Sequence, residues 1–171
     1  MLQKTFLMLA FAGFISTANA QTKEKGVMVG GALMVPSKNI VENAMGSKDH
    51  TTLVAAVKAA GLVETLSSNG PFTVFAPDNA AFNKLPEGTV PDLLMPENKD
   101  KLGNVLKYHV VSGKYTSADL KDGIKLKTVT GETITITYKG KTWMVNNAKI
   151  KIADVISSNG VTYVIDTVLM P

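Results

Sequence analysis

The stretch that most constrains the fold is residues 70–85, which read G-P-F-T-V-F-A-P-D-N-A-A-F-N-K-L. The β-branched and aromatic run from Phe72 to Phe75 predicts a buried strand, because such side chains favour the pleated backbone. Pro77 has no N–H to donate to a sheet, so we expect the strand to end there. Asp78 can cap a following helix that buries Phe82 on its inner face. The segment therefore predicts a rigid corner between a strand and a helix.

The first residues have the marks of a secretory signal peptide over residues 1–20. Lys4 lies near the start, an apolar run follows over residues 6–15, and Ala18-Asn19-Ala20 is a small-residue cleavage site. The apolar run is too short to span a bilayer, so we expect cleavage after Ala20 and no transmembrane span afterwards. This pattern predicts a secreted protein and leaves the choice between periplasm and extracellular space open.

Two absences in the composition narrow the function classes. The chain has no cysteine, which excludes disulfides, thiolate catalysis and cysteine-based metal sites. All 18 basic residues are lysines, so the bidentate grip of arginine on phosphate is missing. We therefore expect no nucleic-acid partner.

The hydrophobic spacing divides the chain into an arm, a helical half and a strand-rich half. Residues 21–36 are predicted to form an N-terminal arm, because the apolar stretch from Gly26 to Pro36 is broken by glycines and suits an edge strand better than a helix. Residues 37–171 are predicted to form one domain. Its first half has helical spacing, with a cap at Ser37 or Asn39, a bend at Gly61 and one amphipathic helix over residues 97–107.

The second half changes to the period-two alternation of strands. Pro91 is expected to begin a single helical turn, and residues 108–111 to form a short strand. Further strands are predicted over residues 124–127, 133–138, 142–145, 149–152 and 161–168. Asn159-Gly160 is expected to be a hairpin turn, because both residues tolerate positive φ. Helices followed by a mostly antiparallel sheet folded on itself indicate an α+β fold rather than a βαβ nucleotide fold.

Three segments together closely resemble a fasciclin-like domain, in particular a bacterial single-domain secreted member. They are residues 70–82, Tyr108-His109, and the C-terminal stretch over residues 159–171. The resemblance implies a wedge or sandwich of two small, mostly antiparallel β-sheets with helices packed on one side. It also implies an exported domain used in cell adhesion or in attachment to extracellular matrix. Residues 26–42 resemble the leader that precedes the domain in bacterial members.

The same resemblance points to candidate binding residues. In animal members, the Tyr-His segment and short Asp-Ile-type motifs have been proposed as integrin contacts. The matching positions here are Tyr108 and His109, and Asp154 with Val155 and Ile156. The chain departs from the animal pattern before Asp154, where it has an isoleucine and an alanine in place of an acidic residue and a proline.

No catalytic or metal-binding constellation stands out in the sequence. We interpret His109 as a structural residue hydrogen-bonded to backbone or to Asp78 rather than as a catalytic base. His50 beside Asp49 lacks the further ligands that a metal site needs, and the irregular spacing of the methionines favours core filling over copper binding. We therefore predict no catalytic residues, no metal and no cofactor.

Lysines are concentrated in the strand-rich half. Between residues 123 and 153 there are six lysines and one acidic residue, Glu132. Period two places Lys125 with Lys127, and Lys149 with Lys151, on shared strand faces. Such a face either discourages edge-to-edge pairing of sheets or binds an acidic polysaccharide or a lipid headgroup surface.

These observations favour an exported, non-enzymatic domain that mediates cell adhesion or attaches to a matrix or cell-surface polymer. The expected partners are cell-surface or matrix proteins or an acidic polysaccharide, and the oligomeric state stays open. The alternative is a periplasmic or envelope protein that binds a small ligand in a cleft between the helices and the sheet. A hydrolase is the third reading.

Overall fold

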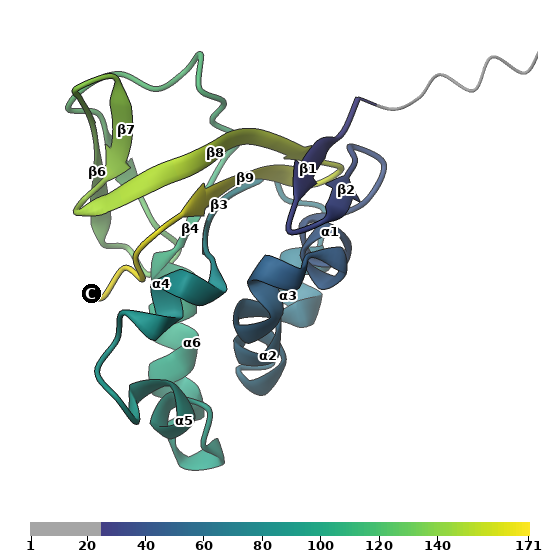
Figure 1. Ribbon diagram of the computed structural model, residues 1–171, viewed down its shortest axis with the longest axis vertical. Coiled ribbons are helices and arrows are strands. Elements are labelled where there is room, and N and C mark those ends of the chain that lie inside the picture. The colour runs from purple at the N-terminus through teal and green to yellow at the C-terminus, as the bar shows by residue number, and fades with distance from the viewer. Residues whose placement is uncertain (1–24) are drawn as a thin grey trace, which may run out of the picture.

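Helices and a curved sheet form the two layers of the molecule (Figure 1). The computed structural model describes residues 25–171, so the expected signal peptide lies outside the described residues. The helices lie on one side of the sheet, which confirms the α+β fold. Their bounds are α1 (Ile40–Gly46), α2 (Thr51–Ala59), α3 (Val63–Ser67), α4 (Asn79–Asn83), α5 (Thr89–Leu93) and α6 (Lys99–Tyr108), with 3₁₀ turns η1 (Lys48–His50) and η2 (Pro96–Asn98).

The main sheet has seven strands in the order β4-β3-β9-β8-β7-β6-β5. Their bounds are β3 (Phe72–Pro77), β4 (Val110–Ser112), β5 (Lys125–Lys127), β6 (Thr133–Lys139), β7 (Thr142–Val145), β8 (Ala148–Ser157) and β9 (Gly160–Ile165). All neighbouring strands of this sheet pair antiparallel except β3 and β9, which are parallel. A bridge between Val111 and Thr128 joins the two ends of the strand order, so the sheet curls almost into a barrel.

The predicted corner lies at the centre of this architecture, because β3 contributes to both hydrophobic cores. Val74 and Ala76 point into the core between the helices and the sheet. Phe75, between them, points into the core inside the curled sheet and stacks on Tyr163 with ring centroids 5.3 Å apart. The strand ends at Pro77, as expected, and Phe82 of α4 is buried against it in the first core.

The N-terminal arm contains a hairpin that forms a separate two-stranded sheet. Strands β1 (Val27–Val29) and β2 (Ala32–Met34) pair antiparallel around a turn at Gly30 and Gly31, both of which have positive φ. Val29 and Met34 pack against Val155 and Val164 of the main sheet. The hairpin therefore covers the face of β8 and β9 near their shared turn, as Figure 1 shows.

Local start signals of the helices are largely confirmed. Asn39 caps α1 through a reciprocal pair of bonds, in which Glu42 N–H donates to Asn39 Oδ1 and Asn39 N–H donates to Glu42 Oε2, both at 2.9 Å. Helices α2 and α3 are separated at Gly61, which has positive φ. Pro91 does not begin its helix, because α5 already starts at Thr89.

Of two sequence-based expectations near strand ends, the first is wrong and the second is confirmed. Tyr108 and His109 do not belong to a strand, because α6 continues through Tyr108 and His109 caps it, so both side chains are buried instead of one. The predicted hairpin turn is confirmed, because β8 and β9 pair Ser157 with Gly160 on its two sides. Neither Asn159 nor Gly160 has a positive φ, and Gly160 is already part of β9, where it pairs with Phe72 of β3.

Candidate functional site

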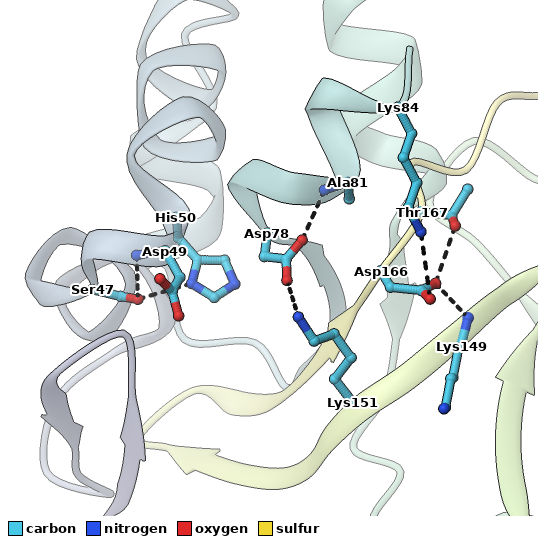
Figure 2. A network of polar contacts seen from close by, with 10 residues as sticks. All are labelled: Ser47, Asp49, His50, Asp78, Ala81, Lys84, Lys149, Lys151, Asp166 and Thr167. Atoms are coloured by element: carbon cyan, nitrogen blue, oxygen red, sulfur yellow. Dashed lines mark hydrogen bonds and ion pairs between the residues drawn. The ribbon is translucent and has the colours of Figure 1, made fainter.

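A polar network joins the corner to strand β8 (Figure 2). Asp78 is 5% exposed, and its Oδ1 accepts the N–H of Ala81 at 2.8 Å, which confirms the predicted helix cap. Its Oδ2 accepts a hydrogen bond from Lys151 Nζ at 2.6 Å. This bond raises the pKa of the Lys151 ammonium, which therefore stays charged and paired with the corner.

His50 lies beside this ion pair, with its ring directed toward Asp78 (Figure 2). Its Nδ1 is 2.9 Å from Ser47 Oγ, while Nε2 is buried and has no hydrogen-bond partner. Burial lowers the pKa of His50, and the neighbouring carboxylates of Asp78 and Asp49 act in the opposite direction. The ring is therefore neutral near pH 7 and packs as part of the helix start.

Asp166 forms the second part of the network. Its Oδ1 accepts from the Lys149 N–H at 2.8 Å and from Thr167 Oγ1 at 3.0 Å, and Lys84 Nζ lies 3.5 Å from Oδ2. Partial burial acts to raise the pKa of Asp166, but these hydrogen bonds and the Lys84 charge outweigh it and lower the pKa. The carboxylate is thus a satisfied structural group that fastens the end of β9 to β8.

The candidate pair Lys149 and Lys151 does not share a strand face. The register shifts between Ile150 and Ile152, which pair with the consecutive residues Ile165 and Val164. Such a bulge inverts the alternation, and Ile150 accordingly packs in the core inside the sheet while Ile152 packs beneath the N-terminal hairpin. Lys151 is turned toward Asp78, so its charge is already paired.

His109 is held by backbone groups on both sides of its ring. Its Nδ1 donates to the Val105 carbonyl at 2.8 Å, and its Nε2 accepts from the Leu169 N–H at 2.8 Å. Burial lowers the pKa of His109 to about 4, so the ring is neutral near pH 7. The backbone-bonded reading is confirmed, although Asp78 is not a partner. Tyr108 is also buried, and its hydroxyl accepts from Asn146 Nδ2 at 3.1 Å.

The Asp-Val-Ile motif is built into strand β8. Asp154 has a φ of 56°, and its carboxylate accepts from the Ser117 N–H at 2.7 Å and from the Ser117 hydroxyl. Val155 is 0% exposed in the core beneath the N-terminal hairpin, and Ile156 packs against the core inside the sheet. The motif therefore holds the 113–124 loop against β8, and its aspartate is engaged within the molecule.

Four exposed lysines lie on one face of the curled sheet, which we name the outer lysine face. On β5 and β6, Lys125 is opposite Thr135 and Lys127 opposite Thr133. The same face continues through cross-strand partners of β6, β7 and β8 as far as Lys149. The members of the outer lysine face are Lys125, Lys127, Lys139 and Lys149, all of them exposed.

A small apolar cavity of about 40 Å³ lies between the helices and the sheet, where the alternative reading placed a cleft. Its walls come from α1, α2, α3, β3 and α6, and include Ile40, Val57, Leu66, Val74 and Leu106. His109 and Thr162 are among the few polar residues in its lining.

Within residues 25–171, no three His, Cys, Asp or Glu side chains are grouped so that they could hold a metal ion. Helices in the same part of the chain are too short or too polar to cross a membrane.

The expectation that the methionines fill the core is wrong for most methionines of the described residues, because Met28, Met45, Met95 and Met170 are exposed.

Asn159 has a structural role beyond the predicted turn. Its Nδ2 donates to the carbonyls of Leu66 and Ser68 at 2.6 and 2.9 Å, and its Oδ1 accepts from the Ile40 N–H at 3.0 Å. The side chain thus binds α1 and α3 to the β8–β9 turn. In the sequence, the Asn159-Gly160 dipeptide predicts a turn, but it does not predict these long-range hydrogen-bond partners.

Comparison with known proteins agrees with this architecture. A family model described as the Fasciclin domain matches residues 48–171. The chain is 50% identical over 157 residues to protein sll1483 of Synechocystis sp. (strain ATCC 27184 / PCC 6803 / Kazusa), covering 92% of this chain and 87% of that protein. It is 43% identical over 110 residues to the cell surface glycolipoprotein MPB83 of Mycobacterium bovis (strain BCG / Tokyo 172 / ATCC 35737 / TMC 1019), covering 64% and 48% of the two chains.

A similar solved structure is a FAS1 domain pair from the insect cell adhesion molecule fasciclin I. The TM-score is 0.72 at 19% sequence identity, and the match covers 80% of this chain and 52% of that chain. At this identity the likeness concerns the fold.

Proposed function

Because this chain belongs to the fasciclin domain family, we propose that it is an exported, non-enzymatic domain that attaches to a polymer or protein of the cell surface or extracellular matrix. Two similar proteins carry names of this kind, a cell surface glycolipoprotein and an insect cell adhesion molecule. Tyr108, His109 and the Asp154-Val155-Ile156 motif are engaged inside the molecule, so we assign attachment to another surface.

The outer lysine face is the observation that carries this proposal. Its lysines are exposed and project outward from strands β5, β6 and β8 of one curled sheet, so together they make the outer side of these strands positively charged. The partner of such a face is an anionic polymer, and we propose an acidic polysaccharide. Lys151 is left out of the binding surface because Asp78 neutralises it.

Charge reversal on the face tests the proposal. We expect Lys125→Glu, Lys127→Glu and Lys149→Glu, combined in one variant, to abolish retention of the chain on an acidic polysaccharide matrix at low salt. The wild-type retention should weaken steadily as salt is raised, because exposed charges are screened. Retention is measured by pull-down of residues 21–171 across a salt series.

The matched control reverses three exposed lysines elsewhere, Lys48→Glu, Lys99→Glu and Lys101→Glu, which gives the same net charge. This control should keep most of the retention. Equal loss of retention in both triple variants would show that only the net charge matters. Retention of the Lys125→Glu, Lys127→Glu, Lys149→Glu variant would contradict the assignment of binding to the outer lysine face.

The apolar cavity does not favour the alternative function of binding a small ligand between the helices and the sheet. Its volume is about 40 Å³, whereas a cavity that holds a benzene ring has roughly 150 Å³.

A further inference from the structure

The tetrapeptide Ser-Ser-Asn-Gly occurs twice in the chain, over residues 67–70 and 157–160, and the two copies touch. Asn159 Nδ2 of the second copy donates to the Ser68 carbonyl of the first at 2.9 Å. A Cβ atom placed on Gly70 would lie 2.3 Å from the Asn159 carbonyl oxygen. Because the two copies have the same local sequence, a difference in their chemistry has to come from the fold.

The fold holds the second copy in place. Asn159 is 7% exposed, and its side-chain amide makes hydrogen bonds to three backbone groups in and next to α1 and α3. Gly160 is already part of β9, where it pairs with Phe72 of β3. Neither the Asn159 side chain nor the backbone that follows it can rotate without breaking these contacts.

The first copy is exposed and unpaired. Asn69 and Gly70 lie in the connection between α3 and β3, and both are exposed to solvent. Within residues 25–171, neither the Asn69 side chain nor the Gly70 N–H has a hydrogen-bond partner. Glycine has no Cβ atom beside its nitrogen. The carbonyl carbon of the Asn69 side chain is therefore free to swing onto the Gly70 nitrogen.

We propose that Asn69 is a site of spontaneous deamidation and that the fold protects Asn159 from the same reaction. The Gly70 nitrogen attacks Asn69 Cγ, and the Cγ–Nδ2 bond breaks. The proton of the attacking N–H passes through solvent to the leaving nitrogen, which departs as ammonia and leaves a cyclic succinimide. Water then adds to either carbonyl carbon of the succinimide and opens the ring, which gives aspartate or isoaspartate. Water is the co-reactant, and no atom is oxidised or reduced.

The two products differ in their effect on strand β3. Aspartate adds a negative charge and leaves the main chain unchanged. Isoaspartate carries the main chain through the former side chain, which adds one carbon to the path just before Gly70. The Phe72 N–H donates to the Asn159 carbonyl at 3.0 Å, so the chain has little slack there. The Pro71 carbonyl is also held, by the Gly113 N–H at 3.0 Å. Isoaspartate therefore loosens the start of β3.

Peptide mapping of residues 21–171 tests the proposal. The folded chain is kept at mildly alkaline pH, below its unfolding temperature, and is then digested with trypsin. Cleavage after lysine places the two copies in separate peptides, residues 59–84 and 152–171. Mass spectrometry with fragmentation that distinguishes isoaspartate from aspartate follows both asparagines. We expect Asn69 to react at least about tenfold faster than Asn159, which requires a local opening free energy of only about 1.4 kcal/mol at Asn159.

The unfolded chain is the matched control, because guanidinium chloride removes the fold and keeps both tetrapeptides. In guanidinium chloride the two asparagines should react at similar rates. Equal rates in the folded chain would overturn the protection of Asn159. An amide that survives at Asn69 in the folded chain, under conditions that deamidate the unfolded chain, would overturn the assignment of the site.

Two variants test the effect on β3. Asn69→Gln should prevent the reaction, because its longer side chain would have to close a larger and less favourable ring. Asn69→Asp carries the charge of the ordinary product on an unchanged main chain. We expect the incubated wild type to contain an isoaspartate fraction with a lower midpoint of urea unfolding, and incubated Asn69→Gln to lack it. A midpoint lowered as much in Asn69→Asp as in the isoaspartate fraction would overturn the role of the altered main chain.

Discussion

At the scale of single residues, close contacts between distant segments decide which positions tolerate change. Gly160 illustrates this, because a Cβ atom placed on it would lie 1.9 Å from the Phe72 carbonyl oxygen. The parallel strands β3 and β9 meet there in direct register. The glycine is therefore required for the approach of two backbones, and its neighbour Asn159 binds the helices to the same point.

We expect Gly160→Ala to destabilise the protein by about 3 kcal/mol or more, since one of the two strands must move to relieve the clash. Urea denaturation measures the change. Gly103→Ala is the matched control, because Gly103 lies in α6 with nothing within 4 Å of an added Cβ. That control should be neutral or stabilising by up to about 1 kcal/mol, and equal behaviour of the two variants would contradict the close approach.

Acid sensitivity also belongs to the residue scale. The pKa of His109 is lowered to about 4 in the folded protein. Between about pH 6.5 and pH 4, the His109 imidazole therefore binds a proton in the unfolded chain but stays neutral in the folded chain. Stability from this residue is fully present above pH 6.5 and is lost as the pH falls toward 4, by about 3 kcal/mol in total.

Measuring the free energy of unfolding from pH 7.5 to pH 4 should show this loss. His109→Gln can still donate one hydrogen bond and accept another. This variant should have a lower free energy of unfolding at neutral pH, but its free energy of unfolding should depend less steeply on pH. Some slope will remain, because burial also lowers the pKa of His50. If the free energy of unfolding of His109→Gln falls with pH as steeply as that of the wild type, His109 is not the source of the acid sensitivity.

At the scale of elements, the strand and helix that meet at the corner are recognisable from sequence, because each depends on adjacent residues. Asp78 is a good example: the proline before it and the apolar helix face after it predict a cap. Asp78 also forms an ion pair with Lys151, which is far away in the sequence. This contact depends on the position of β8 and on the bulge at Lys151, which turns the lysine toward Asp78.

Two substitutions separate these two contributions of Asp78. Asp78→Ala removes both the cap and the ion pair and should cost about 1–2 kcal/mol. Asp78→Asn keeps an oxygen for the Ala81 N–H and should cost less, because Lys151 is 46% exposed and its pairing is weakened by solvent. Thermal unfolding of the two variants, compared at pH 7, checks the order. A larger loss with asparagine than with alanine would contradict it.

At the scale of the whole molecule, the curled sheet separates a helical side from a solvent-exposed side. Helices cover one core, the N-terminal hairpin covers a small third cluster, and the outer lysine face lies on β5, β6 and β8. Attachment and stability are therefore assigned to different surfaces, so binding variants can be made without disturbing the corner.

The hairpin provides a test at this scale. A chain that starts at Ser37 lacks β1 and β2 and would uncover Val155 and Val164, which are buried beneath Val29 and Met34. We expect a lower midpoint of urea unfolding and binding of a hydrophobic dye, since apolar surface becomes exposed. Retention of the folded fraction on an acidic polysaccharide matrix should be unchanged, and loss of this retention would place the attachment surface at the hairpin instead.

Sequence alone determined the features that depend on near neighbours. The buried strand from Phe72, the caps at Asn39 and Asp78, and the alternation of the late strands follow from local spacing and backbone preferences. These patterns, with the fasciclin-like segments, were sufficient for the α+β fold.

Only the tertiary structure decided which side chains remain available for a partner. The bulge at Lys151, the engagement of Asp154 by Ser117, and the burial of both Tyr108 and His109 depend on how segments far apart in the chain pair in register. Spacing along a strand fixes alternation only while the register is unbroken, because one extra residue moves the following side chains to the opposite face. Pairing in register also aligned lysines from three strands on the outer face of the sheet.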